Sequence, residues 1–216
     1  GRIQYRPYEP CHKMFLVYPH ILSILVDPRS WSFLSSFPSW FNYPLSIPYI
    51  CNTKTLQTMA EDLHIASGSK EQQYQSLVPQ IKGLLQGETN FIANLANICA
   101  ALKEQFNFFW VGFYLVEGKE LVLGPFQGPV ACTRIAYNRG VCGTAWANEE
   151  TLIVPNVDEF PGHIACSSLS KSEIVVPLFQ NGKCIAILDV DSKELNSFDL
   201  IDKQYLNTIL DLLNSQ

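Results

Sequence analysis

The sequence lacks several patterns that define common classes of protein. Its seven cysteines include no C-x-x-C pair and have no regularly spaced histidine partners, which argues against a structural zinc site and against the disulfide framework of a small secreted domain. It also lacks a G-x-x-x-x-G-K-[ST] phosphate loop, and neither Ser167 nor Ser168 stands in a G-x-S-x-G hydrolase motif. Scattered cysteines of this kind predict a reducing compartment, the cytoplasm, and a few reactive thiols.

The sequence has little that would bind a membrane or a nucleic acid. An apolar run over residues 14–26 is broken at Pro19, and it is shorter than the roughly 18–20 residues that cross a bilayer. Residues 59–216 carry ten basic and eighteen acidic side chains, a net charge of −8. We therefore predict neither a membrane partner nor a nucleic-acid partner.

Residues 1–58 differ in composition from the remainder of the chain. They carry a net charge of +3 and hold seven of the thirteen prolines. No small-residue cleavage site follows their apolar run, and the chain does not begin with Met. We expect residues 1–58 to be an extension outside the fold, upstream of a natural start at Met59, and residues 59–216 to form one domain. A targeting segment and a folded interaction arm are the alternatives.

From Met59 onwards the apolar pattern predicts regular elements. Ser69 precedes a stripe of period 3.6 that ends before Gly87, the pattern of an amphipathic helix. Cys99 falls on the apolar face of the next helix and is expected in the core. The predicted helices cover residues 69–87, 89–105, 142–148 and 199–213, and the predicted strands cover 106–116, 120–124, 130–136, 151–155, 172–180 and 183–191. Hairpins, one of them at Asn181-Gly182, imply an α+β fold in which terminal helices cover one face of a mainly antiparallel sheet and the irregular middle covers the other.

Three cysteines within 35 residues form the first group of candidate functional side chains. A reactive thiol needs exposure, nearby positive charge or a helix N-terminus. Cys142 stands at the start of a predicted helix, and Cys132 shares the face of its predicted strand with Arg134. Cys166 follows His163 in a serine-rich loop. The alternative for each cysteine is a buried small residue.

Carboxylates and aromatic residues form the second group. Glu173, Asp189 and Asp191 fall on two paired strands, and Trp110 and Tyr114 are expected to face the same way. Buried carboxylates are costly unless they meet a cation, so we predict a pocket for an ammonium group. A solvent-facing edge is the alternative. A metal is the rival use, but hard oxygens with a single nearby histidine are a poor zinc set, and we predict none.

Five segments together resemble one known family. They are G-P-F-Q-G-P-V-A-C-T-R-I (124–135), R-G-V-C-G-T-A (139–145), F-P-G-H-I-A-C (160–166), S-E-I-V-V-P-L (172–178) and L-D-V-D-S (188–192). The segments resemble those of the GAF-domain free methionine-R-sulfoxide reductases, over about residues 69–213. The resemblance implies a sheet of about six antiparallel strands with the active-site loops on the face away from the terminal helices.

The resemblance also implies roles for the candidate thiols. Cys166 would attack the sulfur of free methionine-R-sulfoxide, release methionine and become a sulfenic acid. Cys132 would then resolve it as a disulfide, which thioredoxin would reduce without any other cofactor. Cys142 is a second candidate for resolving thiol, or for the attacking one.

The pocket residues receive roles in the same way. Glu173, Asp189 and Asp191 would hold the substrate ammonium and the sulfoxide oxygen, and Trp110 and Tyr114 would surround the methyl group. Many GAF domains pair through their terminal helices, so the resemblance is compatible with a homodimer. We expect a sulfoxide reductase. The alternatives are a non-catalytic GAF ligand sensor and a redox-sensing or structural partner domain.

Overall fold

The computed structural model describes residues 62–164 and 167–215. The extension predicted for residues 1–58 lies outside the described residues. Within the described ranges, no helix is long and apolar enough to cross a membrane. In chain order the elements are α3 (Lys70–Leu85), α4 (Phe91–Phe106), β1 (Trp110–Glu117), β2 (Glu120–Gln127), β3 (Arg134–Ala136), α5 (Gly140–Asn148), β4 (Leu152–Val154), the 3-10 helix η3 (Val157–Glu159), β5 (Ser172–Gln180), β6 (Lys183–Ser192), α6 (Leu200–Asp211) and the 3-10 helix η4 (Leu212–Ser215).

Local signals in the sequence set the starts of the long helices. Ser69 and Gln72 form a capping box at α3, in which each side chain accepts a hydrogen bond from the other residue's backbone N–H. The Asn90 side chain caps α4 by accepting from the N–H of Ala93, and Asp199 caps α6. The predicted long helices are therefore confirmed to within a few residues.

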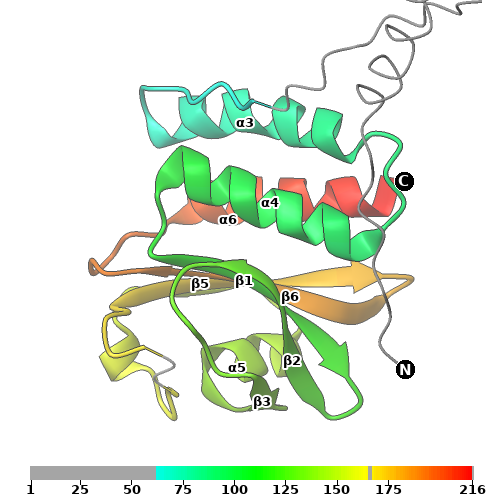
Figure 1. Ribbon diagram of the computed structural model, residues 1–216. Helices are drawn as coiled ribbons and strands as arrows, with labels where there is room; N and C mark the ends of the chain where they lie inside the picture. Colours follow the sequence, from blue (N-terminus) through cyan, green and yellow to red (C-terminus); the bar gives the residue numbers. More distant parts are fainter. Residues whose placement is uncertain (1–61, 165–166, 216) are drawn as a thin grey trace, which may run out of the picture. The chain divides into compact units, whose positions relative to one another are not determined.

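Six strands form one antiparallel sheet in the order β3-β2-β1-β6-β5-β4. Figure 1 shows this sheet between the long helices α3, α4 and α6 on one side and α5 on the other. The two predicted hairpins are present as β1-β2 and β5-β6. Asn181 and Gly182 join β5 to β6 with φ angles of 52° and 73°, the left-handed backbone that a tight hairpin turn requires. β1 pairs with β6, which brings the two hairpins side by side at the centre of the sheet.

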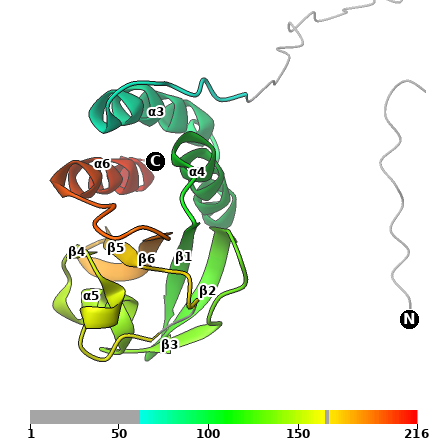
Figure 2. The same cartoon turned by 90° about the vertical axis from the view of Figure 1, so that its left-hand side faces the viewer.

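Two apolar cores lie on opposite faces of this sheet. Helices α4 and α6 lie on one face with α3 packed across them, and α5 with the irregular segments covers the other face (Figure 2). Alternation along β1 sends Val111 and Phe113 to the helical side and Trp110 and Tyr114 to the opposite side. Cys99 is fully buried in the helical core, as predicted. The predicted layering of an α+β fold is confirmed.

Strand β2 runs through Pro125 to Gln127, past residue 124 where the predicted strand ends. The pairing with β1 shifts between Gly112 and Tyr114, so that Gly124 and Pro125 together face a single residue of β1. A bulge tolerates proline because its extra residue needs no ladder hydrogen bond.

The strand predicted over residues 130–136 is also wrong in its first half, since β3 has only three residues and Cys132 lies before it. The carbonyl oxygens of this segment accept hydrogen bonds from side chains. Trp110 Nε1 donates to the oxygen of Pro129 at 3.0 Å, and Tyr114 Oη donates to the oxygen of Cys132 at 3.1 Å. Cys132 therefore shares no strand face with a basic residue.

A polar cluster ties α3 to α6 on the helical side. Asp202 is buried, and its carboxylate accepts hydrogen bonds from Tyr74 Oη at 2.9 Å, from the Asp199 N–H at 2.9 Å and from Lys70 Nζ. The ring of Tyr205 stacks on that of Tyr74, with 5.1 Å between their centroids. Every polar atom of this buried carboxylate is thus paired, as a stable interior requires.

Candidate active site

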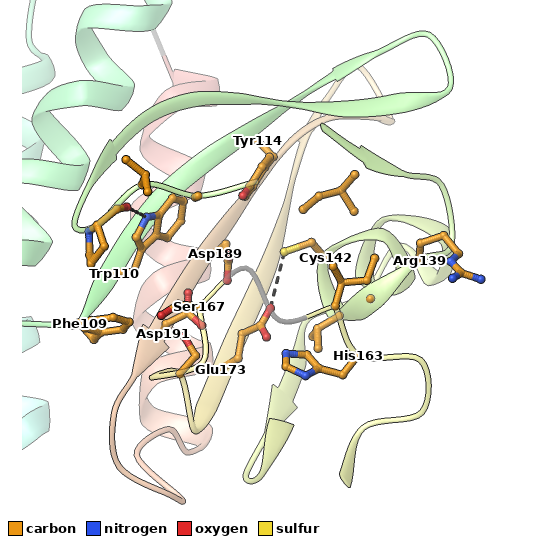
Figure 3. A pocket seen from close by; sticks show the side chains of 18 residues that line it. Phe109, Trp110, Tyr114, Arg139, Cys142, His163, Ser167, Glu173, Asp189 and Asp191 are labelled. Carbon is orange, nitrogen blue, oxygen red and sulfur yellow. Dashed lines mark hydrogen bonds between the residues drawn. The ribbon is translucent and has the colours of Figure 1, made fainter. Parts of the chain in front are cut away.

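A pocket lies on the sheet face opposite to the long helices (Figure 3). Its empty volume, including the open space at its mouth, is about 570 Å³. Strands β1, β5 and β6 supply one side, and the first turn of α5 with the loops before β3 and before β5 supplies the other. The predicted site residues that line it are Trp110, Tyr114, Cys142, Glu173, Asp189 and Asp191.

The three predicted carboxylates meet in this pocket because of strand register. Asp191 pairs with Glu173 on β5 and with Trp110 on β1, and Asp189 pairs with Gly112. Paired positions share a face of the sheet, so all three carboxylates point to the pocket side. Glu173 is only 6% exposed and Asp189 only 7%. The alternative of a solvent-facing acidic edge is therefore wrong.

The side chains of Glu173, Asp189 and Asp191 form an acidic wall of the pocket, and all three bind a proton more tightly than an ordinary carboxylate. Burial raises the pKa of Glu173 well above its ordinary value, and the charges of Asp189 and Asp191 add to the effect. Burial also raises the pKa of Asp189, with Asp191 adding to it. Burial raises the pKa of Asp191 to about 6, partly offset by a hydrogen bond with Ser170. Such a cluster retains protons near neutral pH or binds a cation, so it can serve as a proton donor and as an ammonium site.

One oxygen of the acidic wall has no hydrogen-bond partner within the part of the chain that the structure describes. Asp189 Oδ1 is buried and makes no hydrogen bond to any residue of the described ranges. Leaving a buried acceptor unpaired is unfavourable, and Asp189 projects into the pocket in Figure 3. A ligand carrying N–H donors would satisfy this oxygen.

Cys142 stands in the first turn of α5 and faces the acidic wall. It is 5% exposed, and its thiol donates a hydrogen bond to Glu173 Oε1 at a sulfur–oxygen distance of 3.6 Å. Burial raises the pKa of this thiol well above its ordinary value, and the nearby charges of Asp189 and Glu173 add to it. The sequence predicts the opposite from the helix N-terminus, and the prediction is wrong because desolvation and neighbouring carboxylates outweigh the backbone amides.

Two aromatic side chains form the apolar wall, as predicted. The rings of Trp110 and Tyr114 stack with 5.9 Å between centroids, and Trp110 also stacks on Phe126 at 5.4 Å. Tyr114 is 1% exposed, and its hydroxyl is bonded to the carbonyl of Cys132. The aromatic wall is therefore connected directly to the segment that carries this cysteine.

The thiols predicted for catalysis have different states. Cys132 is disulfide-bonded and partly buried against the pocket-side core. The free cysteines among the described residues are Cys99, Cys142 and Cys184. Cys166 lies outside the described residues, so its position in the pocket stays a prediction. Ile164 and Ser167, which stand on either side of residues 165–166 in the chain, both line the pocket.

The donor atoms of Cys142, Glu173 and Asp189 lie within 4.8 Å of one another. One thiol with two carboxylates combines a soft donor with hard ones and matches the usual ligand set of neither zinc nor magnesium. We assign no metal to this cluster, and the metal-free site stays a prediction.

Some pocket residues were not expected from the sequence. Phe109 precedes β1, and Val130 and Ala131 form part of the rim. Gly112 allows Trp110 to lie against the sheet, because a Cβ at this position would come within 2.4 Å of the indole. A glycine inside an aromatic strand is the signal that could have revealed this close approach.

Comparison with known proteins identifies the class of this domain. Residues 90–216 match the GAF domain family, in agreement with the six-stranded sheet and its flanking helices. The chain is 71% identical over 158 residues to GAF domain-containing protein A of Dictyostelium discoideum, a match that covers 73% of this chain and 100% of that protein.

Two further similarities are more specific. The chain is 41% identical over 155 residues to the free methionine-R-sulfoxide reductase of Saccharomyces cerevisiae, covering 68% of this chain and 86% of that protein. The X-ray structure of the Neisseria meningitidis free methionine-R-sulfoxide reductase in complex with its substrate is 54% identical, with a TM-score of 0.70 and coverage of 72% and 94% of the two chains. The chain belongs to the free methionine-R-sulfoxide reductase family of GAF-domain proteins.

Proposed function

We propose that this protein reduces free L-methionine (R)-S-oxide to L-methionine with its own thiols. The observation that carries the proposal is a pocket lined both by a buried acidic wall and by the residues just before disulfide-bonded Cys132. In this wall, Asp189 Oδ1 has no hydrogen-bond partner among the described residues. The names of the Saccharomyces and Neisseria relatives support the choice of substrate.

The acidic wall explains why the substrate would be a free amino acid. Its ammonium group would be held by Glu173, Asp189 and Asp191, and Asp189 Oδ1 would accept a hydrogen bond from one of its N–H groups. Trp110 and Tyr114 would surround the methyl group. A peptide-bound methionine sulfoxide has an amide in place of the ammonium, so it would leave buried carboxylates uncompensated.

The first chemical step transfers the oxygen atom from the substrate sulfur to the sulfur of Cys166. The thiolate of Cys166 would attack the sulfoxide sulfur, and a protonated carboxyl of the acidic wall would donate a proton to the oxygen. The oxygen then moves to the Cys166 sulfur as the sulfoxide S–O bond and the sulfur–sulfur bond formed in the attack both break, which leaves Cys166 as a sulfenic acid and releases methionine. The substrate sulfur gains two electrons, and the Cys166 sulfur loses them.

The second step would form a disulfide. The Cys132 thiol attacks the sulfenic sulfur, a Cys132–Cys166 bond forms, and the hydroxyl leaves as water. Thioredoxin, a protein dithiol, would then reduce this disulfide by thiol–disulfide exchange and become oxidised itself. The disulfide-bonded state of Cys132 supports this order.

A coupled assay tests the proposal. We expect the full chain with thioredoxin, thioredoxin reductase and NADPH to oxidise NADPH when free methionine-R-sulfoxide is added. The S-epimer and N-acetyl-methionine-R-sulfoxide, which lacks the ammonium, should give little or no turnover. No turnover with the R-epimer under thioredoxin or a small dithiol would overturn the proposal and favour a GAF sensor.

Two cysteine variants separate the steps. Cys166→Ser should abolish methionine formation, whereas Cys132→Ser should form about one methionine per chain and then stop with thioredoxin. Cys184→Ser is the matched control, because Cys184 is a free cysteine of β6 that does not line the pocket. Full activity of Cys166→Ser would contradict the assignment of the attacking thiol.

The activity is further proposed to reside in residues 59–216. The Dictyostelium relative is matched over its whole length by 73% of this chain, which supports this assignment. A chain of residues 59–216 should retain the kcat of the full chain. An insoluble or inactive product would show that residues 1–58 belong to the fold.

A further inference from the structure

The thiol of Cys142 lies too deep and too close to carboxylates to be a third redox group. It is 5% exposed, and α5 holds it against strands β5 and β6. Its hydrogen-bond partner is Glu173 Oε1 at 3.6 Å, and a carboxylate oxygen of Asp189 lies within 4.8 Å of the same group. Figure 3 shows the sulfur directed at these two carboxylates.

The charges around Cys142 disfavour its thiolate from several elements. Glu173 faces it from β5, Asp189 and Asp191 contribute from β6, and Tyr114 lies on β1. Burial and these carboxylates raise the pKa of the thiol, so the proton stays on sulfur. The basic side chains that line the same pocket are Arg139 and His163, and neither has a hydrogen bond to Cys142 among the described residues.

Cys142 is also free while Cys132 is disulfide-bonded. The oxidised state of the protein therefore forms without Cys142. A thiol that keeps its proton, remains reduced and points at a carboxylate has one clear use, which is to donate a hydrogen bond.

We propose that Cys142 is a positioning residue, whose S–H holds the Glu173 carboxyl in place for substrate and which never exchanges electrons. The inference rests on the proposed function and adds a role for Cys142. Glu173 is otherwise surrounded by carboxylates that repel it when ionised. A fixed donor at Oε1 leaves the other oxygen for the substrate and favours one orientation of the group.

Replacing the donor tests this role. Cys142→Ser removes sulfur but keeps a donor of similar size, and should retain kcat/KM within about threefold of the wild-type value. Cys142→Ala removes the donor and should lower kcat/KM by about tenfold, mainly through a higher KM. The matched pair Cys184→Ser and Cys184→Ala should change neither constant. A thiol that exchanged electrons could not be replaced by serine. A kcat/KM retained in Cys142→Ser but lowered in Cys142→Ala would therefore identify the side chain as a hydrogen-bond donor.

Thiol mapping on the wild-type chain decides the point even if Cys142→Ala fails to fold. After turnover without thioredoxin, the protein is unfolded and alkylated with iodoacetamide, and peptides are analysed by mass spectrometry. We expect Cys142 to be alkylated at every stage. A Cys142 disulfide, or a Cys142→Ser variant that makes no methionine, would overturn the inference while the wild-type activity stands. An inactive wild-type chain would overturn the proposed function and this inference with it.

Discussion

The indole of Trp110 lies directly over Gly112 on the pocket face of β1. A Cβ built at Gly112 would stand 2.4 Å from Trp110 Cη2 and 2.4 Å from Phe126 Cβ. The indole is further held by the hydrogen bond from Nε1 to the Pro129 carbonyl. The position of the apolar wall therefore depends on a residue without a side chain.

We predict that Gly112→Ala weakens substrate binding more than it slows turnover. The added methyl group must displace the indole or separate β1 from β2, and overpacking of this kind costs about 1–3 kcal/mol of stability. KM should rise several-fold with a smaller change in kcat, and chemical denaturation should show the loss of stability. Gly83→Ala is the control, because its Cβ would meet nothing within 4 Å. Unchanged KM and stability in Gly112→Ala would contradict the prediction.

A second prediction concerns the hydroxyl of Tyr114. Tyr114→Phe deletes the donor to the Cys132 carbonyl, which should lower the free energy of unfolding by about 1 kcal/mol. Under the proposed function it should also slow recycling by thioredoxin, because the Cys132 segment loses an anchor, and leave the first turnover intact. Single-turnover and steady-state rates distinguish the two steps. Tyr137→Phe is the control, since Tyr137 is 52% exposed and its hydroxyl bonds to no described residue. A slowed first turnover in Tyr114→Phe would place the hydroxyl in the chemical step instead.

The fold was largely predictable because its local signals agree with one another. Ser69 begins a helix, and Asn181-Gly182 turns a hairpin, each through backbone geometry that the residues themselves favour. The bulge at Pro125 was not predictable, because it depends on how β2 pairs with a distant position of β1. The late start of β3 was not predictable for a related reason. The carbonyl oxygens of Pro129 and Cys132, just before this strand, accept hydrogen bonds from the side chains of Trp110 and Tyr114, and no local pattern reveals these contacts.

The site was predictable where strand alternation decides it. Two aspartates two apart on one strand must share a face, so Asp189 and Asp191 were correctly placed beside Glu173 and the aromatic pair. The state of Cys142 was not predictable, because its raised pKa comes from burial and from carboxylates on other elements. A helix N-terminus alone gives the wrong sign for this thiol.

A third prediction follows from the protonation of the acidic wall. The folded-state pKa of Asp191 is raised to about 6, above that of an unfolded aspartate, so between these values the folded state binds more protons than the unfolded one. Its contribution to stability is therefore present below the unfolded pKa and is lost as pH rises through about 6. Asp191→Asn should match the wild type near pH 4 and exceed its unfolding free energy at pH 7 by about 1–3 kcal/mol. The measurement is denaturant unfolding at both pH values.

Asp199→Asn serves as a control of opposite sign for that experiment. Burial raises the pKa of Asp199, but the hydrogen bonds from Lys70 and from the N–H of Ile201, together with the charge of Lys70, outweigh it and hold the pKa below its ordinary value. Its stabilising contribution is present at neutral pH and is lost as pH falls, so this variant should lose more stability at pH 7 than at low pH. An Asp191→Asn profile parallel to that of the wild type would contradict the third prediction.

A fourth prediction separates the stability of the fold from the chemistry of the pocket. Lys70→Met removes a cation that pairs with buried Asp202 and with Asp199, and an uncompensated buried carboxylate costs about 3–5 kcal/mol. Tyr74→Phe removes one donor to the same carboxylate and should cost about 1–2 kcal/mol.

Both Lys70 and Tyr74 lie on α3, and the sheet stands between them and the pocket. The denaturant midpoint should therefore fall further in Lys70→Met than in Tyr74→Phe, while the KM of the folded enzyme stays constant in both. Lys82 is an exposed residue of α3, and Lys82→Met should alter neither the midpoint nor KM. A raised KM in Tyr74→Phe would mean that the two faces of the sheet are energetically coupled, because no residue of this cluster touches the pocket.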